Sequence, residues 1–355
     1  MRTIIKKLIP RPVKQAVRDG INSLRIAAVP FFANSKFSAL TYYKLLSNSF
    51  ANEQNGVLVG INKHLNTPIG QYYRLVRNIH RLEKGLCMVP RKDVFALDYI
   101  DETVSAFAVL ANEAIKFSDQ LNWASGVLNK YFSEVEANDQ QYITAKAQFW
   151  QIINRHQLAI GNDKTPYPRG MQVDSAVNYA SLKDLSVKRR SVRWYLPHAV
   201  PRELLDQAVQ VATLAPSACN RQPFEFRIYD QPELKDKIIN IPGGTTGWSH
   251  NAPVVIAVVG NLSAYCEEHD RHLIYIDSSL AAMALMYALE TLGLSSCAIN
   301  FPDTKLNNAG AKQHLSLQTD EKVIMLISVG YADPNGLIPY SQKKTIDQLR
   351  SFNKL

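Results

Sequence analysis

Cysteine is scarce in this chain of 355 residues, and its few copies do not cluster. Cys87, Cys219, Cys266 and Cys297 form no C-x-x-C pair and lack the even spacing of a secreted disulfide-rich domain. Scattered thiols favour a reducing compartment and argue against a disulfide framework or a zinc site. Cys219 and Cys297 are therefore expected to be free, buried thiols, and no metal ion is expected.

Long apolar runs are missing as well. No stretch approaches the roughly 18 apolar residues that a membrane-spanning helix needs. Lys6, Lys7 and Arg11 interrupt the apolar segment that a signal peptide would require, so the sequence favours a cytoplasmic protein. The nucleotide-binding patterns G-x-x-x-x-G-K-[ST] and strand-borne G-x-G-x-x-G are also absent, and the glycine-rich residues 243–247 are expected to form a loop.

Acidic residues are scarce only at the start of the chain. The formal net charge is +9, and residues 1–25 hold seven Arg or Lys residues and one Asp, a net +6 that leaves +3 for the remainder. Because the excess is local, no nucleic-acid-binding surface is expected over the whole molecule.

Apolar residues are interleaved with these N-terminal charges. Val13, Val17, Ile21 and Leu24 follow one another at spacings of four, four and three, as on one face of a helix that starts after Pro12. Residues 1–40 are therefore expected to form a basic amphipathic segment. Two interpretations stay open: residues 1–25 contact an anionic membrane surface peripherally, or the helix packs on its own domain or a partner.

Helical periodicity dominates residues 41–160, which are predicted to form an all-helical domain. Residues 26–70 are expected to hold loops and short elements, because prolines and glycines interrupt them. Regular helices are predicted over residues 71–86, 94–117, 124–136 and 139–155. Residues 161–172 have the composition of a linker that Pro166 and Pro168 stiffen.

His80 and Glu83 share one face of the first of these helices. They are candidates for metal ligands, for an acid–base group, or for a charged hydrogen-bond cluster that fixes the helix to the following domain. The last interpretation is favoured, because a metal site needs three or four ligands and no second pair is visible in this region.

Residues 173–355 alternate helices with apolar strands without strict β-α-β order, which predicts an α+β layered domain. Strands are predicted at residues 224–229, 254–259, 295–300 and 323–329. The second strand is a continuous β-branched run, typical of a strand that is covered on both faces. Helices are predicted at residues 181–188, 201–215 and 273–292.

Two polar segments of this domain are candidates for a binding site. Arg189, Arg190, Ser191 and Arg193 place three guanidinium groups and a hydroxyl within five residues, and Arg forks suit phosphate. The second segment is a proline-bounded turn whose side chains offer donors and acceptors to the polar edge of a heteroaromatic ring. Its candidate residues are Pro216, Ser217, Asn220 and Gln222.

At these residues the chain resembles the nitroreductase family of FMN-dependent oxidoreductases. The R-x-S-x-R motif, the A-P-S-x-x-N-x-Q-P turn, Gly-Leu-Ser-Ser at residues 293–296, the strand ending at Tyr331 and the pair Lys343-Lys344 occur in family order over residues 175–350. The resemblance implies a nitroreductase-like α/β/α layered domain with a central mixed sheet, and a homodimer. The H-R-x-E-K-G-L pattern of residues 80–86 resembles helical extensions of nitroreductase-like proteins associated with surface-polysaccharide biosynthesis.

The resemblance also implies where FMN would bind. The expected phosphate and ribityl contacts are Arg189, Arg190, Ser191, Arg193, Lys343 and Lys344. The expected contacts to the flavin ring are Pro216, Ser217, Asn220, Gln222 and, through a backbone amide near N5, Ile299 and Asn300. No side chain is expected to act as a nucleophile or general base, because the flavin carries the chemistry.

The implied function is transfer of hydride from NAD(P)H through flavin N5 to a small acceptor of nitro, quinone-like or sugar-linked type. Two alternatives stay open. One is another activity on the same fold, such as flavin processing, dehalogenation or azoline oxidation. The other is a membrane-associated interaction protein with a vestigial flavin site, which the intact set of Arg, Ser and Asn residues disfavours.

Overall fold

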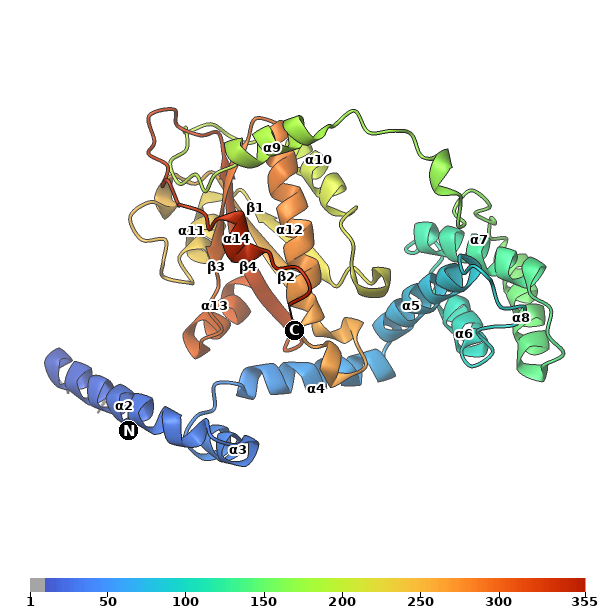
Figure 1. The fold of residues 1–355 in the computed structure, drawn as a ribbon, viewed down its shortest axis with the longest axis horizontal. Helices are drawn as coiled ribbons and strands as arrows, with labels where there is room; N and C mark the ends of the chain where they lie inside the picture. The colour runs from blue at the N-terminus through green and yellow to red at the C-terminus, as the bar shows by residue number, and fades with distance from the viewer. Residues whose placement is uncertain (1–9, 355) are drawn as a thin grey trace. The chain divides into compact units, whose positions relative to one another are not determined.

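The computed structural model describes residues 10–354, with the helices and strands labelled in Figure 1. The chain separates into two compact units, residues 1–55 and residues 56–355. Residues 1–9 of the predicted basic segment 1–40 lie outside the described residues. The sheet and most of the helices belong to the second unit.

The first unit contains helices α2 (Arg11–Phe32) and α3 (Lys36–Leu45). Pro12 lies in the first turn of α2, where a missing N–H costs no helical hydrogen bond. Ser35 and Ser38 cap α3 reciprocally, since each hydroxyl accepts the backbone N–H of the other residue. The Phe32 and Tyr42 rings pack with their centroids 5.4 Å apart and join the two helices.

The prediction of loops between residues 26 and 70 is wrong, because α4 (Ala51–Asn66) and the start of α5 (Pro68–Leu86) occupy much of this range. The glycines mark close packing instead of chain breaks. A Cβ atom on Gly60 would lie 2.7 Å from the Leu262 backbone, and one on Gly56 would lie 3.0 Å from the Thr319 carbonyl oxygen. Glycine thus lets α4 approach the sheet domain closely.

Helices α5 to α8 pack around one apolar core, which includes the buried rings of Phe107, Tyr131 and Phe149. The helix predicted over residues 94–117 is shorter than expected, because Ala96 has a φ of 66° and the regular helix starts only at Ile100. The helices are α6 (Ile100–Ala111), α7 (Ser118–Glu134) and α8 (Gln140–His156). The domain boundaries near residues 160 and 172 stay predictions.

The sheet of the second unit has four strands in the order β1-β2-β4-β3, and neighbouring strands pair antiparallel. A parallel bridge joins Ser191 to Ser296 at the β3 edge, which makes the sheet mixed. Each strand prediction is confirmed to within two residues at either end. The strands are β1 (Phe224–Tyr229), β2 (Val254–Asn261), β3 (Ser295–Asn300) and β4 (Glu321–Gly330).

Helices lie on both sides of the sheet (Figure 1). Alternate side chains of β2 pack against these two helical layers. The even-numbered residues from Val254 to Val258 pack with α10 and α12. The odd-numbered residues from Val255 to Val259 pack with α11 and α13. The predicted α+β domain with α/β/α layers is therefore present. The helices are α9 (Tyr179–Lys188), α10 (Arg202–Ala212), α11 (Pro232–Ile239), α12 (Leu273–Thr291), α13 (Lys305–Leu315) and the short α14 (Ile346–Leu349).

Helix α12 corrects one expectation about apolar runs. Within the described part of the chain, the stretch Glu268–Thr291 is long and apolar enough by composition to cross a membrane. Half of its apolar window is buried in the structure, where α12 packs against β2 and α10. A core helix covered on several sides accounts for this composition.

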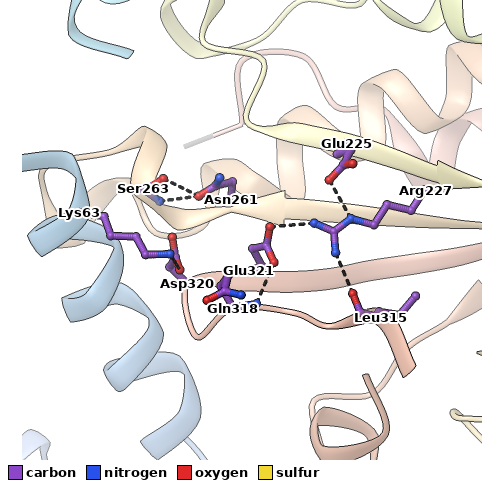
Figure 2. A network of polar contacts seen from close by, with 9 residues as sticks. All are labelled: Lys63, Glu225, Arg227, Asn261, Ser263, Leu315, Gln318, Asp320 and Glu321. Carbon is purple, nitrogen blue, oxygen red and sulfur yellow. Dashed lines mark hydrogen bonds and ion pairs between the residues drawn. The ribbon is translucent and has the colours of Figure 1, made fainter. Parts of the chain in front are cut away.

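Polar contacts join α4 to the end of the sheet (Figure 2). Lys63 of α4 pairs with Asp320, a carboxylate that is only 1% exposed and lies just before β4. Beside this pair, the Arg227 guanidinium of β1 donates to Glu225 at 2.7 Å and to Glu321 at 2.8 Å. The Lys63–Asp320 pair thus fixes α4 against the sheet domain, while the Arg227 contacts link β1 to the start of β4.

Replacing Lys63 with Met is expected to lower the free energy of unfolding by about 1–3 kcal/mol, because it leaves the buried Asp320 carboxylate without its cation. Urea unfolding of the full chain measures the change. Lys92→Met, at an exposed lysine, is the control. An equal effect of both substitutions would show that the ion pair contributes nothing specific.

Candidate cofactor site

The Arg motif lies against the first residues of β3. Helix α9 ends at Lys188, and Arg189 continues the chain in an extended conformation with φ −63° and ψ 114°. The Val192 N–H donates to the Ser296 carbonyl at 3.1 Å, next to the Ser191–Ser296 bridge. Because Val192 is buried in the core beneath the sheet, Ser191 is held at a defined position on this edge.

Two buried polar atoms at this edge have no hydrogen-bond partner within the described residues: Arg189 Nε and Ser296 Oγ. Leaving a buried polar group unpaired costs about 1–3 kcal/mol, so a ligand that pairs with either atom would offset part of this cost. Charge-assisted bonds to Arg favour an acceptor with several anionic oxygens. The pattern fits a phosphate group, and with it the FMN phosphate that the sequence implies.

Cys297 follows Ser296 and is surrounded by the same motif. Burial raises the pKa of its thiol, while Arg193, the Ser191 hydroxyl and Arg189 act in the opposite direction. The net effect keeps Cys297 protonated at neutral pH, so it does not neutralise the arginines. It is a free, buried thiol as predicted, whereas Cys219 is only half-buried, which corrects that expectation.

Arg190 has a different role from its neighbours. Its guanidinium donates to the backbone carbonyls of Pro339, at 2.7 Å, and Tyr340. It thereby ties the segment that follows β4 to the Arg motif. Lys343 and Lys344 are exposed and follow Tyr340 by three and four residues, about 10–14 Å of extended chain. The structure therefore brings the C-terminal segment to the Arg motif. The Arg190 guanidinium is used for these backbone contacts.

The second predicted segment forms a tight turn before β1. Cys219, Asn220 and Gln222 all have positive φ angles between 47° and 54°. Residues other than glycine rarely adopt a positive φ, so surrounding contacts must hold the backbone of this turn in place. The Ser217 hydroxyl accepts the Gln222 N–H at 3.1 Å, and the Gln222 amide donates to the Asn220 side chain at 3.4 Å. Pro216 precedes the turn and is exposed.

A buried carboxylate of α12 anchors this turn from behind. Asp277, 2% exposed, accepts the Ala218 N–H at 3.0 Å and the Tyr265 hydroxyl at 3.2 Å. Arg221 of the turn lies over the Tyr265 ring and pairs with Asp270 at 3.7 Å. The sequence motifs did not point to these residues. The available signal was Asp277 itself, the one acidic residue between Leu273 and Leu289 in an otherwise apolar helix.

Burial raises the pKa of Asp277 despite its hydrogen bonds to Ala218 and Tyr265. A raised folded pKa contributes stability that is fully present below the usual value of 3.8 and is lost as the pH rises through the folded value. The free energy of unfolding of the natural chain is therefore expected to rise on acidification through this window more than that of Asp277→Asn. Urea unfolding at several pH values measures the difference. The control Asp184→Asn, at an exposed position, should show the same pH dependence of the free energy of unfolding as the natural chain. If Asp277→Asn also showed that same pH dependence, the raised pKa would not belong to Asp277.

One chain does not bring the two predicted segments together. The turn precedes Phe224, which pairs with Gly260, whereas Ser296 pairs with Val329 and, through it, aligns with Val254. These positions differ by three strand spacings across the sheet, about 14 Å, and by six residues along β2, about 20 Å. The turn and the Arg motif thus lie at diagonally opposite corners of the sheet, farther apart than one FMN spans between its phosphate and pyrimidine ring.

Ile299 and Asn300 end β3 on the same edge as the Arg motif. Ile299 is buried against Leu326, and Asn300 is exposed. They lie three to four residues beyond Ser296, about 10–14 Å along the strand. A ligand whose anionic end lies at Ser296 therefore has its other end within reach of this backbone.

His80 and Glu83 occupy a hydrogen-bonded cluster between helices. The His80 Nδ1 atom lies 3.7 Å from the Glu83 carboxylate, which also accepts the Trp123 indole N–H at 2.9 Å. Across residues 10–354, no group of three or more His, Cys, Asp or Glu residues is arranged to hold a metal ion. The geometry favours a hydrogen-bond cluster, but the expectation that it fixes the helix to the following domain is wrong, because Trp123 belongs to α7 and the contact joins α5 to α7 within the helical region.

Sequence comparison finds a family model and several curated proteins that are similar to the same region. Residues 187–246 and 240–331 match the model of the nitroreductase family. Iodotyrosine deiodinase 1 from Pongo abelii is 25% identical over 244 residues, which cover 60% of this chain and 82% of that protein. Iodotyrosine deiodinase from Nematostella vectensis is 25% identical over 217 residues, which cover 53% and 79% of the two chains.

Solved structures give similar matches. An FMN-dependent nitroreductase from Clostridium difficile R20291 is 26% identical with a TM-score of 0.41, covering 48% of this chain and 98% of its own. A nitroreductase family protein from Clostridium difficile 630 is 24% identical with a TM-score of 0.42, covering 50% of this chain and all of its own.

The family match spans the Arg motif, the turn and all four strands. The match supports the nitroreductase-like fold that the sequence implies for this part of the chain. The helices before residue 187 and the segment after residue 331 lie outside the match.

Proposed function

We propose that this protein is an FMN-dependent oxidoreductase that takes hydride from NAD(P)H and delivers it to a small acceptor. The observation that carries the proposal is the Arg motif at the β3 edge, where Ser191 bridges Ser296 and where Arg189 Nε and Ser296 Oγ are each buried without a hydrogen-bond partner among the described residues. Such an arrangement is costly without a ligand and suits the phosphate of a flavin mononucleotide.

The residues of the motif have distinct parts in this proposal. Arg189 and Arg193 neutralise the phosphate, and Ser191 and Ser296 supply hydroxyl contacts. Arg190 holds the C-terminal segment so that Lys343 or Lys344 adds positive charge. The chemistry that FMN supplies when bound is reversible uptake of a hydride at N5, which needs no catalytic side chain from the protein.

The ring-binding contacts come from the turn, through Ser217, Asn220 and Gln222. Because the turn and the Arg motif of one chain lie at opposite corners of the sheet, a complete site needs the turn of a second copy. The protein is therefore a homodimer in this proposal. Isologous pairing about a twofold axis would create two equivalent sites, each with a motif from one chain and a turn from the other.

Exposed apolar side chains near the motif support a homodimer. Leu337 and Tyr340, next to the Arg190 contact, are 89% and 80% exposed, and Leu349 and Phe352 follow in the same segment with more than two thirds of their surface exposed. A segment with this much uncovered apolar surface fits an interface better than a solvated surface. A second copy is the occupant that would also complete the cofactor site.

The helical region would help to select the acceptor. Helix α5 packs against the turn at residues 218–220, so its partly exposed polar side chains border the ring-binding segment. The nature of the acceptor stays open between nitro, quinone-like and sugar-linked compounds. The association with polysaccharide biosynthesis likewise stays a prediction.

A dehalogenase activity is the second candidate, because the curated relatives include iodotyrosine deiodinases. Anaerobic addition of NADH or NADPH to the flavin-loaded protein distinguishes the two. Bleaching of the flavin band by either nucleotide, followed by recolouring with a nitroaromatic or quinone, supports the first proposal. A flavin band that persists with both nucleotides, combined with iodide release from iodotyrosine after chemical reduction, supports the second.

A further inference from the structure

The first unit exposes an unusual amount of apolar surface. On α2, Val13, Leu24 and Phe31 are 49%, 75% and 70% exposed. They are separated by eleven and seven residues, about three and two whole helical turns, so they share one face of α2. On α3, Phe37 and Leu40 are 81% and 70% exposed and are three residues apart, which also places them on one face.

The turn between α2 and α3 leaves these apolar side chains exposed. The Ser35–Ser38 capping box fixes the start of α3, and the Phe32–Tyr42 contact occupies the inner faces. Phe31 and Phe37, which adjoin the same turn, remain uncovered. The two helices therefore present large apolar side chains on either side of a well-defined turn.

Charge in this unit identifies the kind of surface that would cover it. Residues 1–55 contain nine Arg or Lys residues and two acidic residues, a net +7 of the total +9, which leaves +2 for residues 56–355. Strong positive charge combined with exposed Leu and Phe on helices is typical of a segment that lies in the interface of an anionic lipid bilayer. A second copy of this basic unit would instead meet like charge.

We propose that α2 and α3 dock this protein on an anionic lipid surface. Phe31, Phe37 and Leu40 enter the boundary between headgroups and acyl chains, while lysines such as Lys36 and Lys44, both exposed, face the anionic headgroups. The docking is peripheral and reversible. It is independent of the flavin site and places the oxidoreductase domain next to lipid-borne or membrane-associated acceptors.

The test is co-sedimentation of the full-length protein with vesicles. The fraction of protein that sediments with vesicles containing phosphatidylserine is expected to be at least about tenfold larger than the fraction that sediments with pure phosphatidylcholine vesicles. High salt is expected to abolish this difference. The double substitution Phe37→Ser/Leu40→Ser should weaken partitioning on the order of tenfold or more. Leu306→Ser, at an 84% exposed residue of α13, is the matched control and should have no effect.

A second variant keeps the test decisive if the apolar substitutions disturb the first unit. Lys36→Glu/Lys44→Glu preserves the apolar face and is expected to remove most of the preference for phosphatidylserine. Equal sedimentation with and without vesicles would overturn the proposal. So would concentration-dependent self-association without lipid that Phe37→Ser/Leu40→Ser abolishes, because it would show that a second copy covers this face.

Discussion

Replacing Arg189 with Ala is expected to weaken FMN binding by about 10- to 150-fold, the equivalent of one charge-assisted hydrogen bond of about 1.5–3 kcal/mol. The reason is local: the Arg189 Nε atom is buried and has no hydrogen-bond partner among residues 10–354, so no other contact would replace its pairing with phosphate. Titration of the flavin-free protein with FMN, followed by quenching of flavin fluorescence, measures the loss.

Lys183→Ala is the matched control for this substitution. Lys183 lies on α9, the helix that leads to Arg189, and is exposed. It should leave FMN affinity within a factor of about two, because screened surface charges contribute little. Equal affinities for the Arg189→Ala and natural chains, with both folded, would remove Arg189 from the phosphate site.

Mixed dimers are expected to regain a cofactor site that neither parent variant has. Arg189→Glu disables the phosphate side by charge reversal, and Asn220→Gly disables the ring side. Glycine tolerates the φ of 54° at this position, so the backbone of the turn is kept. In a dimer with one chain of each kind, one site carries both substitutions and the other carries neither. At an FMN concentration that leaves both parent dimers empty, the mixed dimer should bind about one FMN.

Differently tagged chains allow the mixed dimer to be isolated and its flavin to be counted after extraction. If both parts of the site came from one chain, every site in the mixed dimer would carry one defect and no tight binding would return. A protein that sediments as a monomer at micromolar concentration would contradict the account at an earlier step. Thermal unfolding of each variant confirms that the chains are folded.

The sheet domain could be predicted closely from the sequence, because its strands have strong local signals. The run from Val254 to Val259 is β-branched and continuous, and it became the central β2 with both faces covered. The Arg motif lies at the edge of β3, and its role in phosphate binding stays a prediction. The apolar pattern of a segment predicted its structure wherever the burial of that segment determines which element it forms.

The remaining features depend on contacts between distant segments. Gly56 and Gly60 interrupt the helical pattern in the sequence, yet they lie within α4 because the helix packs against the Thr319 and Leu262 backbone. Helices α11 and α13 were not predicted, since each is short and rich in polar residues. The anchoring of the turn by Asp277 depends on a partner 59 residues away. No single-segment pattern carries such information.

The cofactor site is a further case in which the sequence did not predict how two distant segments are arranged. The Arg motif and the Ser217–Gln222 turn are separated by only one helix in the sequence, which suggests proximity. Strand order places β1 and β3 at opposite edges, and register places the two segments at opposite ends. Only the fold shows that one chain does not bring the two segments together, and our proposal of a second copy rests on this separation.

In our proposal, Arg189, Ser191 and Ser296 hold the phosphate of a flavin nucleotide. Comparison of FMN with riboflavin, which has the same ring and ribityl chain but no phosphate, tests it most directly. Two or three charge-assisted contacts predict that the flavin-free protein binds FMN at least about a hundredfold more tightly than riboflavin, with a preference that Arg189→Ala reduces. Equal affinity for the two flavins would contradict the account.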